Sequence, residues 1–455
     1  MFLANETRES MMHVGVLFLF TPPPDAAPHF LRQWTSELKG SVEVHPPWNL
    51  RLRHPELLKN PLQSWVEDDS FDLEYHVRRS ALPSPGDERE LGILVSRLHS
   101  VQMDFHRPPW ELNFIEGLDR GRFALYLKMH HALVDGYTGM KMLAASLTTD
   151  PTERDTPMFF ARKRPPRRPT SQGETVPSLA TMLDEVRELL REQTGALKDV
   201  GRAVLNVISS ARSGDRTLVT PLHTPRSIIN RRISRNRRFA TQQYPTERLR
   251  RIAKAAGGTI NDVALALCGS ALRRHLLELE ALPDKPMTAM VPVNVRPKDD
   301  PGGGNAVAAI LASLATDVAD PVERLRAIIE STQRAKEQLQ GMSRNAILQY
   351  SALLLAPMTL QLVPGAAGRI RPAFNLIISN VPGPDQPLYF RGARLESLYP
   401  LSIPFHGYGL NITINGYAET LNFGFIGCRD TLPHLQRLAV YSGDALDELD
   451  RALPG

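Results

Sequence analysis

The segment 123–140, a strand-like run that leads into two adjacent histidines, constrains the fold of this chain more than any other. Its residues alternate in character as they do in a β-strand. One face would carry Phe123, Leu125, Leu127 and Met129, and the other Ala124, Tyr126, Lys128 and His130. His131 has the parity of the apolar face, so we expect its imidazole to point inward. Asp135 and Gly136 follow, and the apolar spacing after them is helical, which predicts a strand-to-helix transition.

A histidine at the end of a buried strand suits general base catalysis, because imidazole titrates near neutral pH. The carboxylate of Asp135, four residues after His131, could brace the turn or hold the imidazole in orientation. A single histidine in such a place can equally pack in a core without a chemical role. The prediction therefore depends on the whole pattern HHxxxDG and not on one residue.

Six further segments accompany this pattern along the chain. They are FLANETRESMMHVG at 2–15, RPPWELNFIEGL at 107–118, TINDVALALC at 259–268, VPVNVR at 291–296, NLIISNVPGP at 375–384 and LNFGFIGCR at 421–429. HHALVDG resembles the active-site motif of the CoA-dependent acyltransferase superfamily. The other six segments resemble the bacterial wax ester synthase/diacylglycerol acyltransferase family. The resemblance implies an α/β fold of two similar chloramphenicol-acetyltransferase-like domains, joined by a helical linker, with the active site between them.

The length of the chain also favours two domains, because 455 residues exceed a single ordinary core. We expect an N-terminal acyltransferase domain with the HHxxxDG motif at 1–156, a proline- and arginine-rich, helical linker at 157–226, and a C-terminal acyltransferase domain at 227–455. The sequence predicts strands at 14–20, 112–115, 123–130, 238–244, 288–295, 306–315, 374–379, 409–417 and 420–428. It predicts helices at 27–38, 87–102, 179–209, 245–256, 259–280, 322–339, 345–362 and 433–453.

The two cysteines, Cys268 and Cys428, stand in no metal-ligand spacing, so we predict neither a metal site nor a disulfide framework. This usage fits a reducing cytoplasm. The first fifteen residues contain Glu6, Arg8 and Glu9 and lack an apolar run, which argues against a signal peptide. The uncharged segment 345–368 is long enough to span a bilayer, but it contains the central Pro357 and several polar residues. We interpret it as a buried or interfacial helix, and peripheral membrane contact stays open.

Basic residues gather in two clusters, although the net charge is only +5. The clusters are Arg162, Lys163, Arg164, Arg167 and Arg168, and Arg226, Arg231, Arg232, Arg235, Arg237 and Arg238. No nucleic-acid partner is expected, because neither cluster belongs to a reading module and few aromatic residues are interleaved. An anionic membrane surface or the phosphates of CoA fit better, and a solvated face is the alternative.

The resemblance assigns roles to several residues. His131 would be the general base, and His130 would support its loop. Asp135 would hold the turn through an arginine. Asn261, from the family's ND motif, would contact the oxyanion or the hydroxyl, although helix capping explains it as well.

Three further residues are candidates for substrate binding. Gly136 would permit a tight turn or a close approach of the backbone. Trp110 would form a core or a wall, since indole offers only a donor. Glu6 would lie at the mouth of the site or be a surface charge on a short helix. Apolar stretches at 352–355 and 398–403 could line acyl tunnels, and core packing explains them equally well.

The implied reaction moves a long-chain acyl group from acyl-CoA to a long-chain fatty alcohol, with slower acylation of diacylglycerol to triacylglycerol. His131 would take the hydroxyl proton as that oxygen attacks the thioester carbonyl, and the imidazolium would protonate the thiolate that leaves. No acyl-enzyme is required, and no nucleophile elbow is present. Acyl-CoA is a substrate, so no cofactor is expected.

Three alternatives remain at this point. The chain could act mainly on diacylglycerol. It could be a condensation-type acyltransferase that uses carrier-bound thioesters, which accounts poorly for the PPWE, ND and ISNVPGP segments. It could be a non-catalytic protein of lipid-droplet surfaces, against which the intact His131 and Asp135 argue. The expected location is cytoplasmic, with association with the inner membrane face or lipid droplets left open, as is a homodimer.

Overall fold

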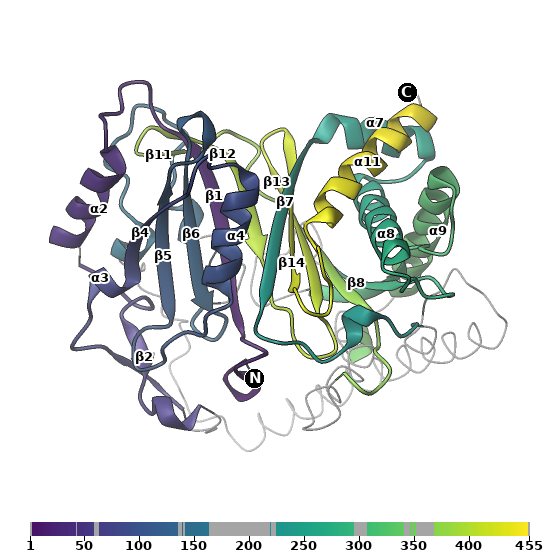
Figure 1. Ribbon diagram of the computed structural model, residues 1–455, viewed down its shortest axis with the longest axis horizontal. Coiled ribbons are helices and arrows are strands. Elements are labelled where there is room, and N and C mark those ends of the chain that lie inside the picture. Colours follow the sequence, from purple (N-terminus) through teal and green to yellow (C-terminus); the bar gives the residue numbers. More distant parts are fainter. Residues whose placement is uncertain are drawn as a thin grey trace, which may run out of the picture.

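Two six-stranded β-sheets stand next to each other in the computed structural model, one in each half of the view in Figure 1. The structure describes residues 2–41, 43–58, 63–134, 139, 142–162, 219, 224–294, 307–340, 346–347, 349–351 and 368–453. Residues 163–218 and 220–223 of the predicted linker, which include the helix at 179–209, and most of the helix at 345–362 lie outside these residues. The predicted α/β class, with two sheet-and-helix units, is confirmed.

The first sheet has the strand order β11-β12-β1-β6-β5-β4. Its strands are β1 (His13–Thr21), β4 (Val77–Ala81), β5 (Trp110–Glu116), β6 (Phe123–His130), β11 (Tyr389–Phe390) and β12 (Ala393–Leu401). Helix α2 (Phe30–Ser41) packs on one face and α4 (Glu88–His99) on the other, so β6 is buried on both sides. The short elements around this sheet are α1 (Phe2–Asn5), β2 (Leu50–Leu52), η1 (Pro55–Leu57), β3 (Trp65–Glu67), α3 (Leu73–His76), η2 (Asp119–Gly121) and η3 (Phe159–Ala161).

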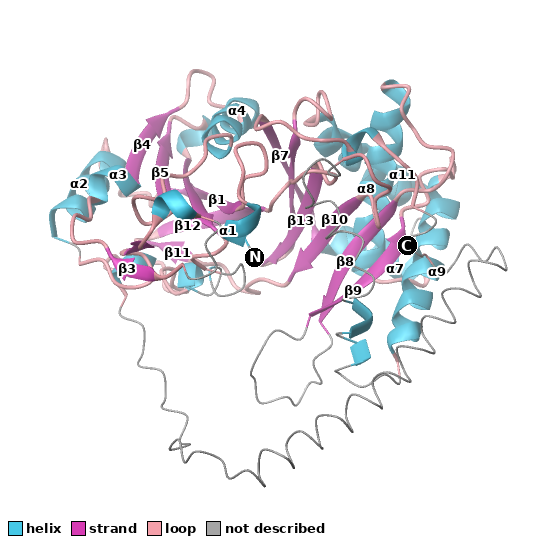
Figure 2. Cartoon of the chain, turned by 90° about the horizontal axis from the view of Figure 1, so that it is seen from below, coloured by secondary structure: helices cyan, strands magenta, loops and turns pink. Residues whose placement is uncertain are grey.

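The second sheet has the strand order β7-β14-β13-β10-β8-β9. After η4 (Ile228–Asn230), its strands are β7 (Arg237–Pro245), β8 (Thr288–Asn294), β9 (Val307–Ser313), β10 (Leu376–Val381), β13 (Leu410–Tyr417) and β14 (Thr420–Cys428). Helices α7 (Thr246–Ala256), α8 (Ile260–Glu278), α9 (Pro321–Leu339) and α11 (Arg437–Ala452) cover the side turned away from the first sheet (Figures 1 and 2). Their apolar faces and the sheet form the largest core of the molecule.

Strand β12 connects the two halves, because it follows most of the second half in sequence but pairs with β1 in the first sheet. The pairing is antiparallel and places Leu401 opposite Gly15 and Arg394 opposite Thr21. The boundaries 1–156, 157–226 and 227–455 remain a proposal. They assign β11 and β12 to a different domain from the sheet in which these strands lie.

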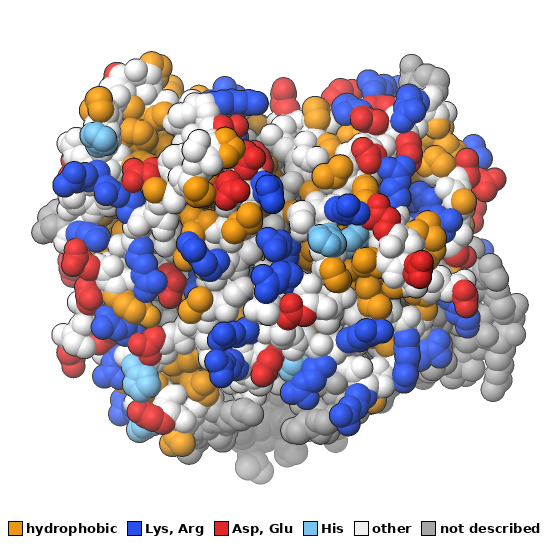
Figure 3. All heavy atoms as spheres, in the orientation of Figure 1, with side chains coloured by type: hydrophobic (Ala, Val, Ile, Leu, Met, Phe, Trp, Pro, Cys, Tyr) orange, Lys and Arg blue, Asp and Glu red, His pale blue; other side chains and the backbone are white. Residues whose placement is uncertain are grey.

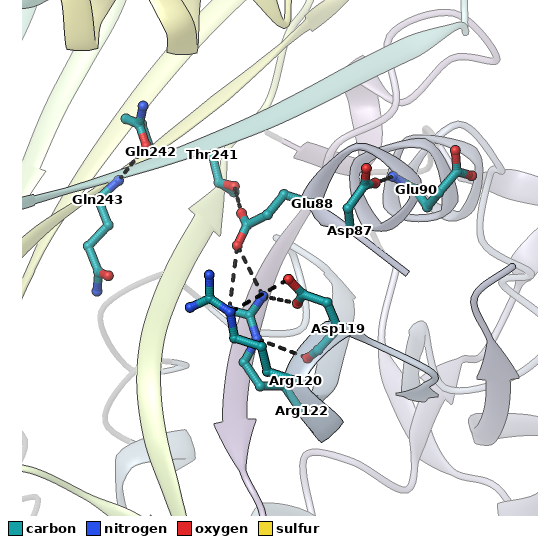
Figure 4. Close-up of polar contacts among 9 residues, drawn as sticks. All are labelled: Asp87, Glu88, Glu90, Asp119, Arg120, Arg122, Thr241, Gln242 and Gln243. Atoms are coloured by element: carbon teal, nitrogen blue, oxygen red, sulfur yellow. Dashed lines mark hydrogen bonds and ion pairs between the residues drawn. The ribbon is translucent and has the colours of Figure 1, made fainter. Parts of the chain in front are cut away.

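Helix α4 and strand β7 form a second connection between the halves. The Ser96 hydroxyl accepts a hydrogen bond from the backbone N–H of Phe239 at 2.9 Å, and the Ser100 hydroxyl accepts one from Arg237 at 2.9 Å. At the start of α4, Glu88 lies 3.5 Å from a guanidinium nitrogen of Arg122 and accepts from the Thr241 hydroxyl at 3.2 Å (Figure 4). A shared apolar cluster fills the space between these contacts.

Most predicted strands and helices of the described residues are confirmed within a few residues at their ends. The sequence did not indicate β4 or β12. The stretch 398–403 includes the end of β12, where Leu398 and Leu401 are 2% and 1% exposed and pack in two cores. Core packing is therefore the explanation for this stretch. The stretch 352–355 lies outside the described residues.

Candidate active site

His131 is the first residue of the turn after β6, because the strand ends at His130. The backbone of both residues is anchored. The N–H of His130 donates to the Pro109 carbonyl at 2.9 Å, and that of His131 donates to the Met12 carbonyl at 3.0 Å. The His131 side chain is half-buried and stacks on the Phe2 ring, with 4.0 Å between centroids. The predicted strand parity does not extend to His131, so its imidazole lies at the margin of the core beside α1.

His130, in contrast, is completely buried. Its Nδ1 accepts a hydrogen bond from the backbone N–H of Ala132 at 3.1 Å, so the neutral ring carries its proton on Nε2. Nε2 faces the Glu6 carboxylate and lies 3.4 Å from Oε2, which is longer than a normal hydrogen bond. The Phe105 ring stands edge-on at 5.1 Å. His130 therefore joins the turn to Glu6.

Glu6 follows α1 directly, and its side chain is 1% exposed. Oε2 accepts a hydrogen bond from the backbone N–H of Met12 at 2.5 Å, and Oε1 accepts one from the side chain of Gln102 at 2.8 Å. Glu6 is thus an interior residue, so the expectation of a surface charge on a short helix is wrong. A direct contact with substrate at the mouth of the site stays untested.

Polar side chains fill the same face of the first sheet behind His130. His13 stands opposite His130 in the pairing of β1 with β6, and its Nε2 lies 2.9 Å from the carbonyl of His99. Nδ1 of His99 lies 2.6 Å from the Tyr126 hydroxyl. Burial lowers the pKa of both His13 and His99 well below the usual value, and nearby positive charges, including Lys128, act in the same direction. Both imidazoles are therefore neutral at neutral pH.

Lys128 is buried next to these histidines, on strand β6. Its ammonium lies 3.3 Å from a carboxylate oxygen of Glu111 and donates to the carbonyls of Leu98 and Val101, each at 3.1 Å. Burial lowers the Lys128 pKa, and Glu111 opposes this effect. The alternation of β6 predicted a more polar face. Its burial was not predicted, because a polar strand face is usually exposed to solvent. Helix α4 covers this face, and Leu98 and Val101 at and just after its end meet the ammonium, so the face is interior.

Asn261 and Asp262 of the ND motif lie in the first turn of α8 and have different partners. Thr259 caps the helix and forms a reciprocal capping box with Asp262, whose carboxylate also accepts from the Thr332 hydroxyl at 2.7 Å. Capping is therefore the structural role of Asp262. The Asn261 amide oxygen accepts a hydrogen bond from the Asn380 side chain at 3.4 Å. This contact brings the ND motif to the NVPGP segment, next to the end of β10.

Trp110 begins β5 and has no exposed surface. Its indole N–H donates to the Trp48 carbonyl at 2.6 Å, and its ring stacks on His76 and Phe160. Trp110 is a core residue, which agrees with the predicted core or wall position, and its contact with substrate stays a prediction. Asp135 and Gly136 lie outside the described residues.

The second arginine cluster does not form one surface. Arg237 is 3% exposed and donates to the backbone carbonyls of Glu9 and Ser234, each at 2.6 Å. Burial lowers its pKa to about 10. Arg237 thus holds the N-terminal segment against β7, whereas Arg231, Arg232 and Arg235 are exposed.

The described residues contain neither a metal centre nor a helix of membrane-spanning length and composition. No three His, Cys, Asp or Glu side chains among them converge as metal ligands would. Within the same residues, no single helix is long and apolar enough to cross a membrane. The pair formed by α7 and α8 meets the length and composition criteria together, with a bend of 98° between them.

Comparison with known proteins places these features in a family. Residues 1–264 match the wax ester synthase/diacylglycerol acyltransferase catalytic domain, and residues 303–450 match the WS/DGAT C-terminal domain. A putative diacylglycerol O-acyltransferase of Mycobacterium tuberculosis is 55% identical over 99% of this chain and 96% of its own.

Solved structures agree with the sequence relatives. The wax ester synthase/diacylglycerol acyltransferase from Marinobacter aquaeolei VT8 superimposes with a TM-score of 0.79 and 38% identity, covering 100% of this chain and 98% of that one. The first condensation domain of the calcium-dependent antibiotic synthetase shares the fold, with a TM-score of 0.55 and 16% identity over 97% of this chain and 91% of its own. The chain belongs to the wax ester synthase/diacylglycerol acyltransferase family and is an acyltransferase.

Proposed function

We propose that the protein transfers a long-chain acyl group from acyl-CoA to the hydroxyl of an apolar acceptor, a fatty alcohol or diacylglycerol. His131 accepts the hydroxyl proton while the oxygen attacks the thioester carbonyl. The carbon–sulfur bond then breaks, and the imidazolium returns the proton to the CoA thiolate. The products are an ester and free CoA, and no acyl-enzyme forms.

The observation that carries this proposal is the different placement of the two histidines. His131 stands half-buried on a turn whose backbone is held by Met12, while His130 is sealed behind it. A general base needs access to substrate and partial exclusion of water, and only the first position offers both. Asp135 and Gly136 keep their proposed roles in shaping the turn. Asn261, with Asn380 beside it, is proposed to contact the oxyanion or the acceptor hydroxyl.

The acceptor is where two candidate functions differ. Alcohol and diacylglycerol present the same nucleophile to the same base, so only the shape of the acceptor site can separate them. Apolar fit discriminates weakly, by about 10–200-fold per methylene-sized difference. We therefore propose dual activity with the fatty alcohol preferred. The second candidate, a protein that acts mainly on diacylglycerol, is favoured by the name of the 55% identical relative.

One assay separates these candidates. The purified protein is incubated with palmitoyl-CoA and either hexadecanol or dipalmitoylglycerol, and both thiol release and ester formation are followed. Faster release with hexadecanol supports the proposal, and a clear preference for diacylglycerol replaces it with the second candidate. Release of CoA without an ester product indicates hydrolysis. No acceptor-dependent release by the folded protein would favour the non-catalytic lipid-droplet role.

A cytoplasmic location with contact at the inner membrane face or lipid droplets is part of the proposal, because both acceptors partition into lipid. The exposed Arg231, Arg232 and Arg235 are the candidates for this contact. Replacing all three with glutamine should reduce binding to anionic vesicles and leave KM for acyl-CoA in detergent unchanged. A raised KM with normal vesicle binding would assign them to the CoA phosphates instead.

A further inference from the structure

A cavity of about 630 Å³ lies on the second half of the molecule, where α8, α11 and the start of α9 meet. These helices pack together on the outer side of the second sheet (Figures 1 and 2). Its polar lining consists of Ser270, Arg273, Arg274, Arg324, Glu448 and Arg451. Nothing in the proposed acyl transfer uses it.

The lining is strongly basic. Four arginines face a single carboxylate, that of Glu448, so the formal charge is +3. Arg274 is already paired, with Asp444 at 3.0 Å and with Glu448. Arg273 donates to the Thr316 carbonyl at 2.7 Å, and Arg451 donates to the Asp447 carbonyl at 3.1 Å. Within the described part of the chain, neither Arg273 nor Arg451 has a carboxylate within 4.0 Å of its side-chain nitrogens.

Arg324 gives this cavity its unusual character. The residue is 4% exposed, and its guanidinium donates only to neutral oxygens. These are the Ser270 hydroxyl at 2.6 Å, the Val318 carbonyl at 2.7 and 3.1 Å and the Ala319 carbonyl at 2.8 Å. Among the described residues no carboxylate lies within ion-pair distance of it. A buried cation without a counter-ion is costly, and Arg273 and Arg274 on the same cavity increase the cost.

The electrostatic surroundings agree with this geometry. Burial lowers the pKa of Arg324 to about 10, and repulsion from Arg273 and Arg274 acts in the same direction. Glu448 and Asp320 oppose the shift only in part. A guanidinium that only braced the loop before α9 would need no positive neighbours around a cavity. An anion in the cavity would add the negative charge that Glu448 and Asp320 do not supply.

We propose that this cavity binds the phosphate group of a small phosphorylated ligand. Guanidinium groups match phosphate oxygens with paired N–H donors, and arginine is the common residue for this contact. The volume is in the range of small-molecule sites and exceeds what a bare phosphate ion fills. Leu277, Ala319, Pro321 and Ala452 offer apolar wall for the organic part of the ligand.

This site is separate from the acyl-transfer site. Arg273 follows Asn261 by twelve positions on α8, and a helix rises 1.5 Å per residue, so the two lie about 18 Å apart along the helix axis. The inference therefore does not rest on the proposed reaction. The phosphate could come from a soluble nucleotide or from a lipid headgroup, which share this chemistry.

The test uses the full chain, with pyrophosphate, ADP and phosphatidylcholine vesicles containing phosphatidylglycerol as probes. Binding is measured by calorimetry for the soluble probes and by co-sedimentation for the vesicles. The test variant is the double substitution Arg273→Gln/Arg451→Gln, because Arg324→Gln could disturb folding. The matched control is Arg334→Gln, an exposed arginine of α9 outside the cavity.

We expect the double variant to bind pyrophosphate and ADP at least about tenfold more weakly than the native protein, since each lost charged hydrogen bond is worth about a factor of ten. The control should bind normally, and KM for acyl-CoA should stay unchanged in both. If only the vesicles bind, and the double variant binds them more weakly, the site takes the phosphate of a lipid headgroup. Binding that the double variant does not weaken, or no binding of any probe, would overturn the proposal. A raised KM for acyl-CoA would show that the cavity belongs to the donor site.

Discussion

His130 and His131 are neighbours in sequence but occupy opposite kinds of surroundings. His130 is sealed between Glu6, Phe105 and its own turn, whereas His131 is half-buried beside Phe2. A side chain that exchanges protons with substrate must reach it, and one that orients a loop need not. We therefore expect substitutions of His130 and His131 to have different effects on activity.

We expect His131→Ala to lower kcat by about 10²–10⁴, the usual effect of losing a general base. Thermal unfolding should change little, because the substitution keeps the backbone N–H that donates to Met12. His130→Ala should lose only part of the activity. The control is His106→Ala, an exposed histidine paired with Asp104 and Glu56. Near-normal turnover by a folded His131→Ala protein would end the assignment.

Glu6 should act on the reaction through His130. We expect Glu6→Gln to lower kcat by about tenfold, a loss of about 1.4 kcal/mol, because it removes the charge facing Nε2. KM for both substrates should stay constant, because the side chain is interior. Steady-state kinetics of Glu6→Gln, His130→Ala and the double variant form a cycle, in which we expect strongly non-additive losses. Additive losses, or a change confined to KM, would contradict a positioning role.

The positions of the two histidines could be predicted from the sequence, and the surroundings of Glu6 could not. HHxxxDG follows a strongly alternating strand, which is local information. The burial of Glu6 depends on Gln102, far away in sequence, and on Arg237, which pins the loop after α1 to β7. No local pattern carries such contacts.

Among helices and strands, those with a regular apolar periodicity were the ones that could be predicted from the sequence. The buried strands and amphipathic helices were predicted, as was the end of α7 at Gly257, which adopts φ 70°. Strand β12 was not predicted, because Arg394, Glu396 and Ser397 interrupt its apolar residues. The sequence also could not show that β12 pairs with β1.

The contact of β12 with β14 is close enough to test. A Cβ on Gly424 would lie 2.4 Å from the Pro400 carbonyl oxygen. This oxygen belongs to the backbone of a paired strand, so it cannot easily move away. We expect Gly424→Ala to reduce the free energy of unfolding by about 2 kcal/mol, as overpacking does. Urea titration followed by circular dichroism measures the loss. Gly443→Ala in α11 is the matched control, because its Cβ meets only ordinary contacts beyond 3.4 Å. Equal stability of both variants would rule out a tight junction.

For the whole molecule, buried neutral histidines predict a stability that depends on pH. Burial lowers the pKa of His76 to about 4, and the pKa of His13 and His99 is also well below normal. At pH values between the folded-state pKa and the unfolded-state pKa of about 6.5, these histidines bind more protons in the unfolded chain than in the folded one. Their contribution to the free energy of unfolding is therefore complete above about pH 6.5 and is lost as the pH falls. His76 alone should remove about 2 kcal/mol between pH 7 and pH 5.

Urea unfolding at the two pH values measures this loss. His76→Phe should show a smaller drop than the native protein, whatever its stability at pH 7. The exposed His106→Ala variant should keep the native pH dependence. An identical drop in His76→Phe would show that other groups control the acid side of the stability curve.

The pairing of β12 with β1 also fixes an order of events during synthesis. Strand β1 leaves the ribosome long before β12, because most of the described strands and helices lie between them in sequence. One edge of β1 can pair early with β6, but the other waits for most of the chain to be translated, and unpaired strand edges recruit wrong partners. A message truncated before Ala393 should therefore yield an aggregating product and not half an enzyme. We therefore expect the nascent chain to depend on chaperones until β12 has emerged.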